Sequence, residues 1–275
     1  MGFQINTNTA ANTAYRNLSS TQGDMSKSLE KLSSGLRINR AADDAAGLSI
    51  AEGLRSQVNG LGVAARNAQD GISVVQTAEG ALTEVHSILQ RVRDLAVQSG
   101  NDSNNADART AIQTEVTALG DELTRIAGST NFNGTDLLTA AAADLTFQVG
   151  AGSTAANDQI TVKTADVEAV ATAVKGLKFS TAAEALTSIA ALDTQIKAVS
   201  TSRSELGAVQ NRFESAINSI NVSQENLSAA ESRIRDTDMA KEMASFTRSN
   251  ILSQAGTAML AQANQMNQGV LQLLR

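Results

Sequence analysis

Few side chains in this sequence could do chemistry. Its 275 residues include no Cys and one His, His86. The adjacent carboxylates Asp43 and Asp44 could be read as a catalytic or metal-binding pair, but neighbouring residues of a helix point apart. We therefore expect Asp43 or Asp44 to cap a helix. Because one His cannot build a multi-His metal site, we expect His86 to be structural.

Composition excludes several classes of protein. Without Cys there is no disulfide framework, thiolate metal site or cysteine nucleophile. No HExxH motif, phosphate-binding loop or nucleophile elbow occurs. The net charge of −6 argues against a nucleic-acid partner. We therefore expect no enzyme, no catalytic residue, no metal and no cofactor.

The sequence also predicts no membrane partner. It has no run of 18 apolar residues that could form a transmembrane helix. Its first residues lack the basic segment and apolar core of a secretory signal peptide. If the protein is extracellular, we expect it to leave the cell by a route that does not read such a signal.

Apolar residues recur at helical spacing along most of the chain, and Pro is absent. Tyr15, Leu18, Met25, Leu29 and Leu32 alternate steps of three and four, with Gln22 in the one gap, which predicts a helix over about residues 4–35. A second helix should follow Asp43 or Asp44. Its apolar seam changes phase near Val75, where the winding of the helix should change.

Further helices and one hairpin complete the prediction. Residues 100–105 read as a turn, 112–126 as a third helix and 183–230 as a fourth, whereas 165–185 are ambiguous. Alternation at 145–149 and 159–163 predicts a β-hairpin. The fold class is therefore mainly α: an elongated antiparallel bundle or coiled coil of long helices with a small β-hairpin in the middle.

The two ends of the chain share an unusual lack of charge. No charged side chain occurs from Met1 to Tyr15 or from Ser249 to Leu274. The last helix has Leu252, Met259, Met266 and Leu273 seven residues apart, with amides and hydroxyls at its polar positions. A solvent-facing helix normally carries Lys and Glu on its outer face. The pattern favours helices buried in an assembly; an amide-rich helix on a soluble bundle is the alternative.

Polar residues interrupt the apolar seam of the fourth helix at Arg203, Gln210 and Gln224. They could be buried groups that fix the register of the helices. They could equally lie at the edge of the seam, where long side chains reach solvent.

Several long motifs match one family in the same order along the chain. They are Ile5-Asn6-Thr7-Asn8, SSGLRINRAADDAAGLSIAEGLR at 33–55, LQRVRDLAVQS at 89–99, QNRFESAINSI at 210–220, NLSAAESRIRDTDMAKEM at 226–243 and ILSQAGTAMLAQANQ at 251–265. On these motifs the sequence resembles bacterial flagellin over almost its whole length. Only the middle, about 140–185, resembles no known family.

The resemblance implies a structural subunit that polymerises into the filament used for swimming. It implies a D0 layer, from 1–43 and 231–275, around the export channel. It implies a D1 layer from 44–140 and 181–230, with the hairpin and a short variable segment at 141–180 and no large outer domains. The inner packing residues would be Tyr15, Leu18, Met25, Leu29, Leu32, Leu252, Met259, Met266 and Leu273. A hook–filament junction protein of the same family is the alternative.

The resemblance also implies partners and a location. Flagellins leave the cell through the flagellar type III export apparatus, so the location would be the extracellular filament. Expected partners are many copies of the same chain, an export chaperone, the filament cap protein and hook-associated proteins. Arg91, Leu95 and Glu115 match the flagellin patch that Toll-like receptor 5 reads. The alternative is that this surface serves packing between protofilaments.

Overall fold

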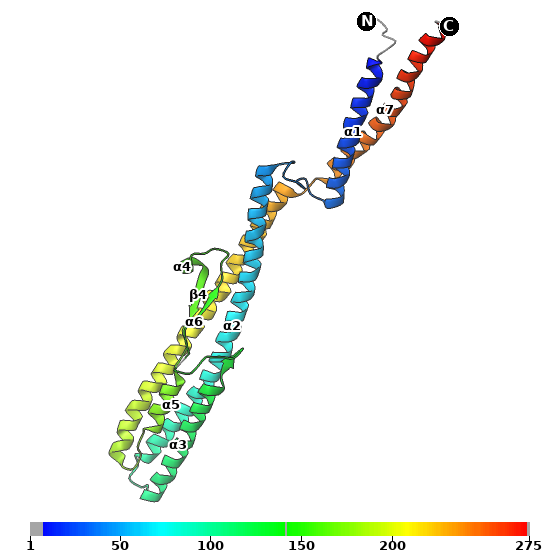
Figure 1. Ribbon diagram of the computed structural model, residues 1–275. Coiled ribbons are helices and arrows are strands. Elements are labelled where there is room, and N and C mark those ends of the chain that lie inside the picture. Colours follow the sequence, from blue (N-terminus) through cyan, green and yellow to red (C-terminus); the bar gives the residue numbers. More distant parts are fainter. Residues whose placement is uncertain (1–7, 141, 274–275) are drawn as a thin grey trace. The chain divides into compact units, whose positions relative to one another are not determined.

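The computed structural model describes residues 8–140 and 142–273, with side chains described up to Gln265. It consists mainly of helices (Figure 1). The elements are α1 (Thr9–Ser34), α2 (Ala45–Ser99), α3 (Ala106–Ser129), β1 (Asn131–Phe132), β2 (Thr135–Asp136), β3 (Leu145–Gln148), α4 (Ala155–Asp158), β4 (Gln159–Val162), α5 (Val167–Lys175), α6 (Ala182–Arg235) and α7 (Met239–Leu273). The mainly helical fold with a small hairpin is confirmed.

The chain divides into two compact units. Unit 1 comprises Met1–Ser56 with Asn226–Arg275, and unit 2 comprises Gln57–Glu225. Both boundaries fall inside long helices, α2 and α6. Unit 1 therefore combines two segments that are distant in sequence, whereas unit 2 is one continuous segment.

The core of unit 2 follows the predicted heptads. In α6 the residues Ala185, Leu192, Val199, Leu206, Phe213 and Ile220, each seven after the last, are all buried. The second phase of the α2 seam, from Ala78 to Ala96, is buried as well. Val74 and Val75 are both buried where the sequence predicts the change of phase. The long helices were thus predicted correctly from apolar spacing alone.

The hairpin of β3 and β4 covers part of this core. Leu145 pairs with Val162 and Gln148 with Gln159 in an antiparallel register. Ile160 and Val162 are buried, and the ring of Phe147 meets that of Phe213 edge to face, with 5.6 Å between centroids. The hairpin therefore adds to the core that α2 and α6 share.

Two small elements were not predicted. α5 lies in the segment that the sequence left ambiguous, and it packs against α3. β1 and β2 form a second, two-residue hairpin whose turn holds Asn133 and Gly134, both at positive φ. Asn and Gly tolerate this left-handed conformation, so the Asn-Gly pair explains the tight turn.

Unit 1 is built on the antiparallel pair α1 and α7, which lie side by side in Figure 1. The side chain of Asn8 donates to the main-chain oxygen of Ala263 (3.0 Å) at one end. At the other end the N–H of Arg37 donates to the oxygen of Arg235, and that of Thr237 to the oxygen of Gly35. The two connections between the long helices are thus hydrogen-bonded to each other.

The two adjacent carboxylates of the first connection bond to the main chain. Asp44 Oδ1 accepts from the N–H of Gly47 (2.9 Å), so Asp44 caps α2 as expected. Asp43 Oδ2 accepts from the N–H groups of Asn39 (3.1 Å) and Arg40 (3.0 Å). These two bonds hold the pKa of Asp43 below its ordinary value. Both carboxylates therefore stabilise the connection between α1 and α2 by accepting main-chain hydrogen bonds.

The Asp43 turn should be sensitive to acid. Because folding lowers the pKa of Asp43, its contribution to stability is present above the unfolded-state pKa and is lost as the pH falls through the folded one. We expect the amide resonances of Asn39 and Arg40 to shift in an NMR pH titration only below the usual Asp range. Asp43→Asn should abolish that shift. A midpoint at or above the usual Asp value would contradict the assignment.

Candidate assembly surfaces

The face that joins α1 to α7 consists mainly of small residues. Ser28, Ser249 and Ala263 are buried there. A Cβ on Gly256 would lie 3.3 Å from Leu18 Cδ1, so this glycine allows the helices to approach closely. Leu18, Met25 and Leu32 are half-buried on the same side of α1. Within one chain, the contact therefore uses few of the large apolar residues of α7.

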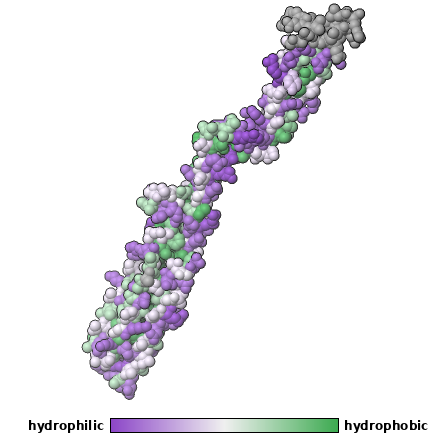
Figure 2. Space-filling model, in the orientation of Figure 1, coloured by the Kyte–Doolittle hydropathy of each residue, from purple (hydrophilic) through white to green (hydrophobic). Residues whose placement is uncertain are grey.

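Other predicted packing residues point to solvent in the single chain. Tyr15 is 66% exposed, Leu252 53% and Met259 61%, and Leu29 is also exposed. Figure 2 shows apolar residues at the surface of this unit among polar ones. The side chains of Met266 and Leu273 lie outside the described residues. Large apolar side chains exposed in a row along a helix mark a surface that binds another apolar surface.

No charge interrupts this surface along most of α7. From Ser249 onward the polar groups are amides and hydroxyls, which can bond to one another, as Gln254 Nε2 does to Asn250 Oδ1 (2.9 Å). Neutral polar groups can be buried against another helix without the desolvation penalty of a charge, provided that they are hydrogen-bonded. The surface is therefore suited to burial in an assembly.

The structure brings Arg91 and Glu115 together on the surface of unit 2. The Nε and Nη2 groups of Arg91 both donate to Glu115 Oε1, at 3.0 and 2.7 Å. Both side chains are about half exposed. Leu95, one turn from Arg91, is only 2% exposed and belongs to the core of unit 2, so it does not share the surface of the pair. The pair alone therefore presents a polar surface.

Arg203 reaches across the seam to α2. Its Nε and Nη2 donate to Glu79 Oε1 at 2.9 and 2.7 Å, and both side chains are about one-third exposed. Gln210 instead donates to Glu214 on its own exposed face. Since neither side chain is fully buried, both lie at the edge of the seam.

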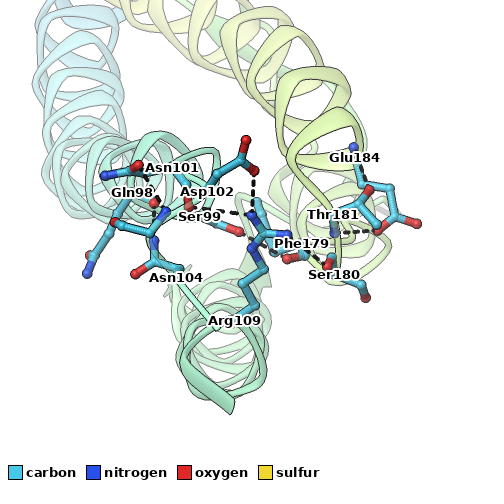
Figure 3. Close-up of polar contacts among 11 residues, drawn as sticks. Gln98, Ser99, Asn101, Asp102, Asn104, Arg109, Phe179, Ser180, Thr181 and Glu184 are labelled. Carbon is cyan, nitrogen blue, oxygen red and sulfur yellow. Dashed lines mark hydrogen bonds and ion pairs between the residues drawn. The ribbon is translucent and has the colours of Figure 1, made fainter. Parts of the chain in front are cut away.

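The connection from α5 to α6 is held by side chains of three helices (Figure 3). Ser99 Oγ donates to the oxygen of Phe179 (3.0 Å), and Ser188 Oγ to that of Lys178 (3.0 Å). Arg109 donates to the oxygens of Ser180 and Asn101, which ties this connection to the turn after α2. Sequence reasoning missed these residues.

Gln113 makes two further bonds to the same connection. Its Nε2 donates to the oxygen of Leu177 and its Oε1 accepts from the N–H of Phe179, both at 3.1 Å. Gln113→Ala should lower the free energy of unfolding by about 1–3 kcal/mol, because two part-buried main-chain groups lose their partner. Chemical denaturation that follows the unfolding of unit 2 measures this loss of stability, with the exposed Gln76→Ala on α2 as the control. Equal stabilities of the two variants would contradict this role.

Among the described residues, no three His, Cys, Asp or Glu side chains gather where they could hold a metal ion. No helix within 8–140 or 142–273 is both long and apolar enough to cross a bilayer. The apolar surface of α1 and α7 and the Arg91–Glu115 pair therefore remain the candidate functional surfaces.

Comparison with known proteins agrees with this geometry. The bacterial flagellin N-terminal helical region matches residues 5–143, and the bacterial flagellin C-terminal helical region matches residues 189–274. The unmatched middle holds β3, β4 and α5.

Whole-length relatives and a solved structure point the same way. A flagellin of Halalkalibacterium halodurans is 52% identical, over 98% of this chain and 99% of that protein. A flagellar filament 33 kDa core protein of Treponema phagedenis is 46% identical, over 98% and 99%. The structure of Bacillus cereus flagellin is 34% identical and covers 60% of this chain and 94% of its own, with a TM-score of 0.50. This chain therefore belongs to the bacterial flagellin family.

Proposed function

We propose that this chain polymerises into the flagellar filament with α1 and α7 as its inner joint. The observation that carries the proposal is the row of exposed apolar residues on α7, Leu252 and Met259, in a segment without charge. Covering such a surface is favourable, because it removes apolar area from water. Other copies of the same chain would cover it, so that α1 and α7 line a tube around the export channel.

The chain is a structural filament subunit for swimming motility, and it is not an enzyme. Relatives that match nearly its whole length carry the names flagellin and flagellar filament core protein. A hook–filament junction protein, the alternative, is not favoured, because both family regions and these full-length relatives are those of flagellins.

Each layer of the filament would be formed by particular segments of the chain. Residues 1–43 and 231–275 would form the inner D0 layer, and 44–140 with 181–230 the D1 layer, with 141–180 as hairpin and variable segment. The division of the structure into two units, one made of both terminal segments and the other of the continuous segment between them, supports two layers. No large outer domain would be present.

Export and assembly would require several partners. The chain would be secreted through the flagellar export apparatus with a chaperone, folded under the filament cap protein and joined to the hook by hook-associated proteins. The exposed Arg91–Glu115 pair is suited to recognition by Toll-like receptor 5, since an Arg fork and a carboxylate are both accessible there. The same surface could also serve packing between protofilaments, which is the role needed for motility.

Electron microscopy of purified protein tests the proposal. After a precipitating salt and short filament seeds are added, we expect long tubular filaments. Deletion of residues 1–35 or 240–275, and the single change Leu252→Asn, should prevent their growth. Filaments that grow equally well from Leu252→Asn would contradict the role of this surface. Monomers or short rings under all conditions would favour the junction protein.

A further inference from the structure

The methionines of this chain are confined to unit 1. All six lie there, at positions 1, 25, 239, 243, 259 and 266, whereas residues 57–225 contain none. The core of unit 2 uses Val, Leu, Ile and Phe instead. The chain has no Cys and no Trp. Its thioethers are therefore the side chains most readily oxidised by a peroxide, and all of them lie in the unit that carries the proposed inner joint.

Of the four methionines whose side chains the structure describes, three are exposed in the single chain. Met259 is 61% exposed, Met243 51% and Met239 47%, whereas Met25 is half-buried on the side of α1 that faces α7. Met259 follows Leu252 by seven residues, so both point to the same side of α7. Met259 is thus both accessible to a small oxidant and central to the row of apolar residues.

We propose that Met259 is an oxidation site, and that its conversion to the sulfoxide blocks assembly. This inference rests on the proposed function, in which other copies cover the exposed side of α7. The sulfur lone pair of Met259 attacks one oxygen of hydrogen peroxide. The O–O bond breaks as the S–O bond forms, and the sulfur is oxidised by two electrons. The proton on the transferred oxygen passes to the departing hydroxide, which leaves as one water molecule.

The product no longer fits a covered apolar surface. Met sulfoxide replaces a flexible apolar side chain by a polar, chiral one with a strong acceptor oxygen. On this side of α7 the side chains that precede Met259, Leu252 and Ala255, are apolar and offer no donor to that oxygen, whereas Gln262, three residues later, carries an amide. Burying the sulfoxide between copies would place a strongly polar oxygen against the apolar row of Leu252 and destabilise the contact.

The exposure of the Met259 side chain also determines whether oxidation acts before or after assembly. In a free chain the thioether meets solvent, whereas in a filament the neighbouring copies cover it. Oxidation therefore acts on unassembled chains and spares finished filaments. Met25, already half-buried within one chain, should show a smaller difference between the two states.

The first experiment compares rates of oxidation by hydrogen peroxide in free chains and in seeded filaments. Peptide mass spectrometry follows the gain of one oxygen, with fragment ions that separate Met259 from Met266. We expect Met259 to react about tenfold more slowly in filaments than in free chains, because neighbouring copies would shield its sulfur from the peroxide. Equal rates at Met259 in the two states would overturn the inference.

The second experiment measures the critical concentration for filament growth before and after oxidation. Each variant is compared with its own untreated sample, so that the effect of the substitution itself cancels. Oxidation should raise the critical concentration of the unaltered chain about tenfold or more. It should raise that of Met259→Leu much less, whereas Met25→Leu, the control, should respond like the unaltered chain. Methionine sulfoxide reductases with dithiothreitol should restore growth.

The outcomes separate this inference from the proposed function. If Leu252→Asn prevents growth but oxidised chains assemble normally, the joint is correct and the Met259 inference is wrong. If oxidised Met259→Leu fails as completely as the unaltered chain, another methionine is responsible. If untreated chains form no filaments, the proposed function fails, and the inference fails with it.

Discussion

Replacing Gly256 with Leu is expected to abolish filament growth while unit 2 keeps its fold. A Cβ at this position would already lie 3.3 Å from Leu18 Cδ1, so the further atoms of Leu would push against the Leu18 side chain. Forcing a larger side chain into such a contact costs about 1–3 kcal/mol. α1 and α7 form one antiparallel pair and little else supports them, so this cost should separate the helices.

Two measurements check this expectation. Hydrogen exchange should show faster exchange in α1 and α7 of Gly256→Leu and unchanged protection in residues 57–99, while electron microscopy should show no filaments. Gly53→Leu is the matched control, because Gly53 lies on a helix of the same unit with no atom within 4 Å of its added Cβ. Filaments of normal length from Gly256→Leu would show that close approach of α1 and α7 is not needed.

The sequence predicted the long helices because their cores repeat large apolar residues. In α6 the heptad from Leu192 to Ile220 stands out from its polar neighbours, and each member is buried. The absence of Pro leaves no strong breaker inside these helices. Element type and most boundaries therefore followed from local pattern alone.

The contact between α1 and α7 could not be predicted in the same way. Its central residues, Ser28, Ser249 and Gly256, are small and carry no apolar signal. The large apolar residues of α7, such as Leu252 and Met259, form a separate line that faces outward in the single chain. The spacing of large apolar residues thus located the proposed intermolecular surface. The contact between α1 and α7 depends instead on the small size of its side chains, which this spacing does not reveal.

The α5–α6 connection was unpredictable for another reason. Its main-chain groups bond to Ser99, Arg109 and Gln113, which lie 64 to 80 residues earlier in the chain. The type and position of a polar residue do not indicate which main-chain group, so distant in sequence, it will bond to. Likewise, Leu95 was expected on the surface with Arg91, since steps of four share a helix face, yet packing of the neighbouring helices buries it.

Phe213→Ala is expected to lower the free energy of unfolding of unit 2 by about 3–5 kcal/mol. Phe213 is fully buried, and its ring contacts that of Phe147 edge to face. It also fills the space left by Gly71 on α2, where an added Cβ would lie 2.6 Å from Phe213 Cζ. Truncation would remove these contacts and leave a cavity between α2, α6 and the hairpin. Chemical denaturation monitored by circular dichroism measures the loss.

Combining this change with one at Gly71 tests whether the two residues fit as a pair. Gly71→Leu alone should destabilise unit 2 by about 1–3 kcal/mol, because the new side chain collides with the Phe213 ring. In the Phe213→Ala chain the same Leu should restore part of the lost stability by filling the cavity. The loss of stability in the double variant should then be smaller than the sum of the losses in the two single variants. Gly80→Leu, with no atom within 4 Å of its Cβ, should show no coupling to Phe213→Ala. Strict additivity of Gly71→Leu and Phe213→Ala would mean that Gly71 does not determine the position of Phe213, and that the hairpin sets it instead.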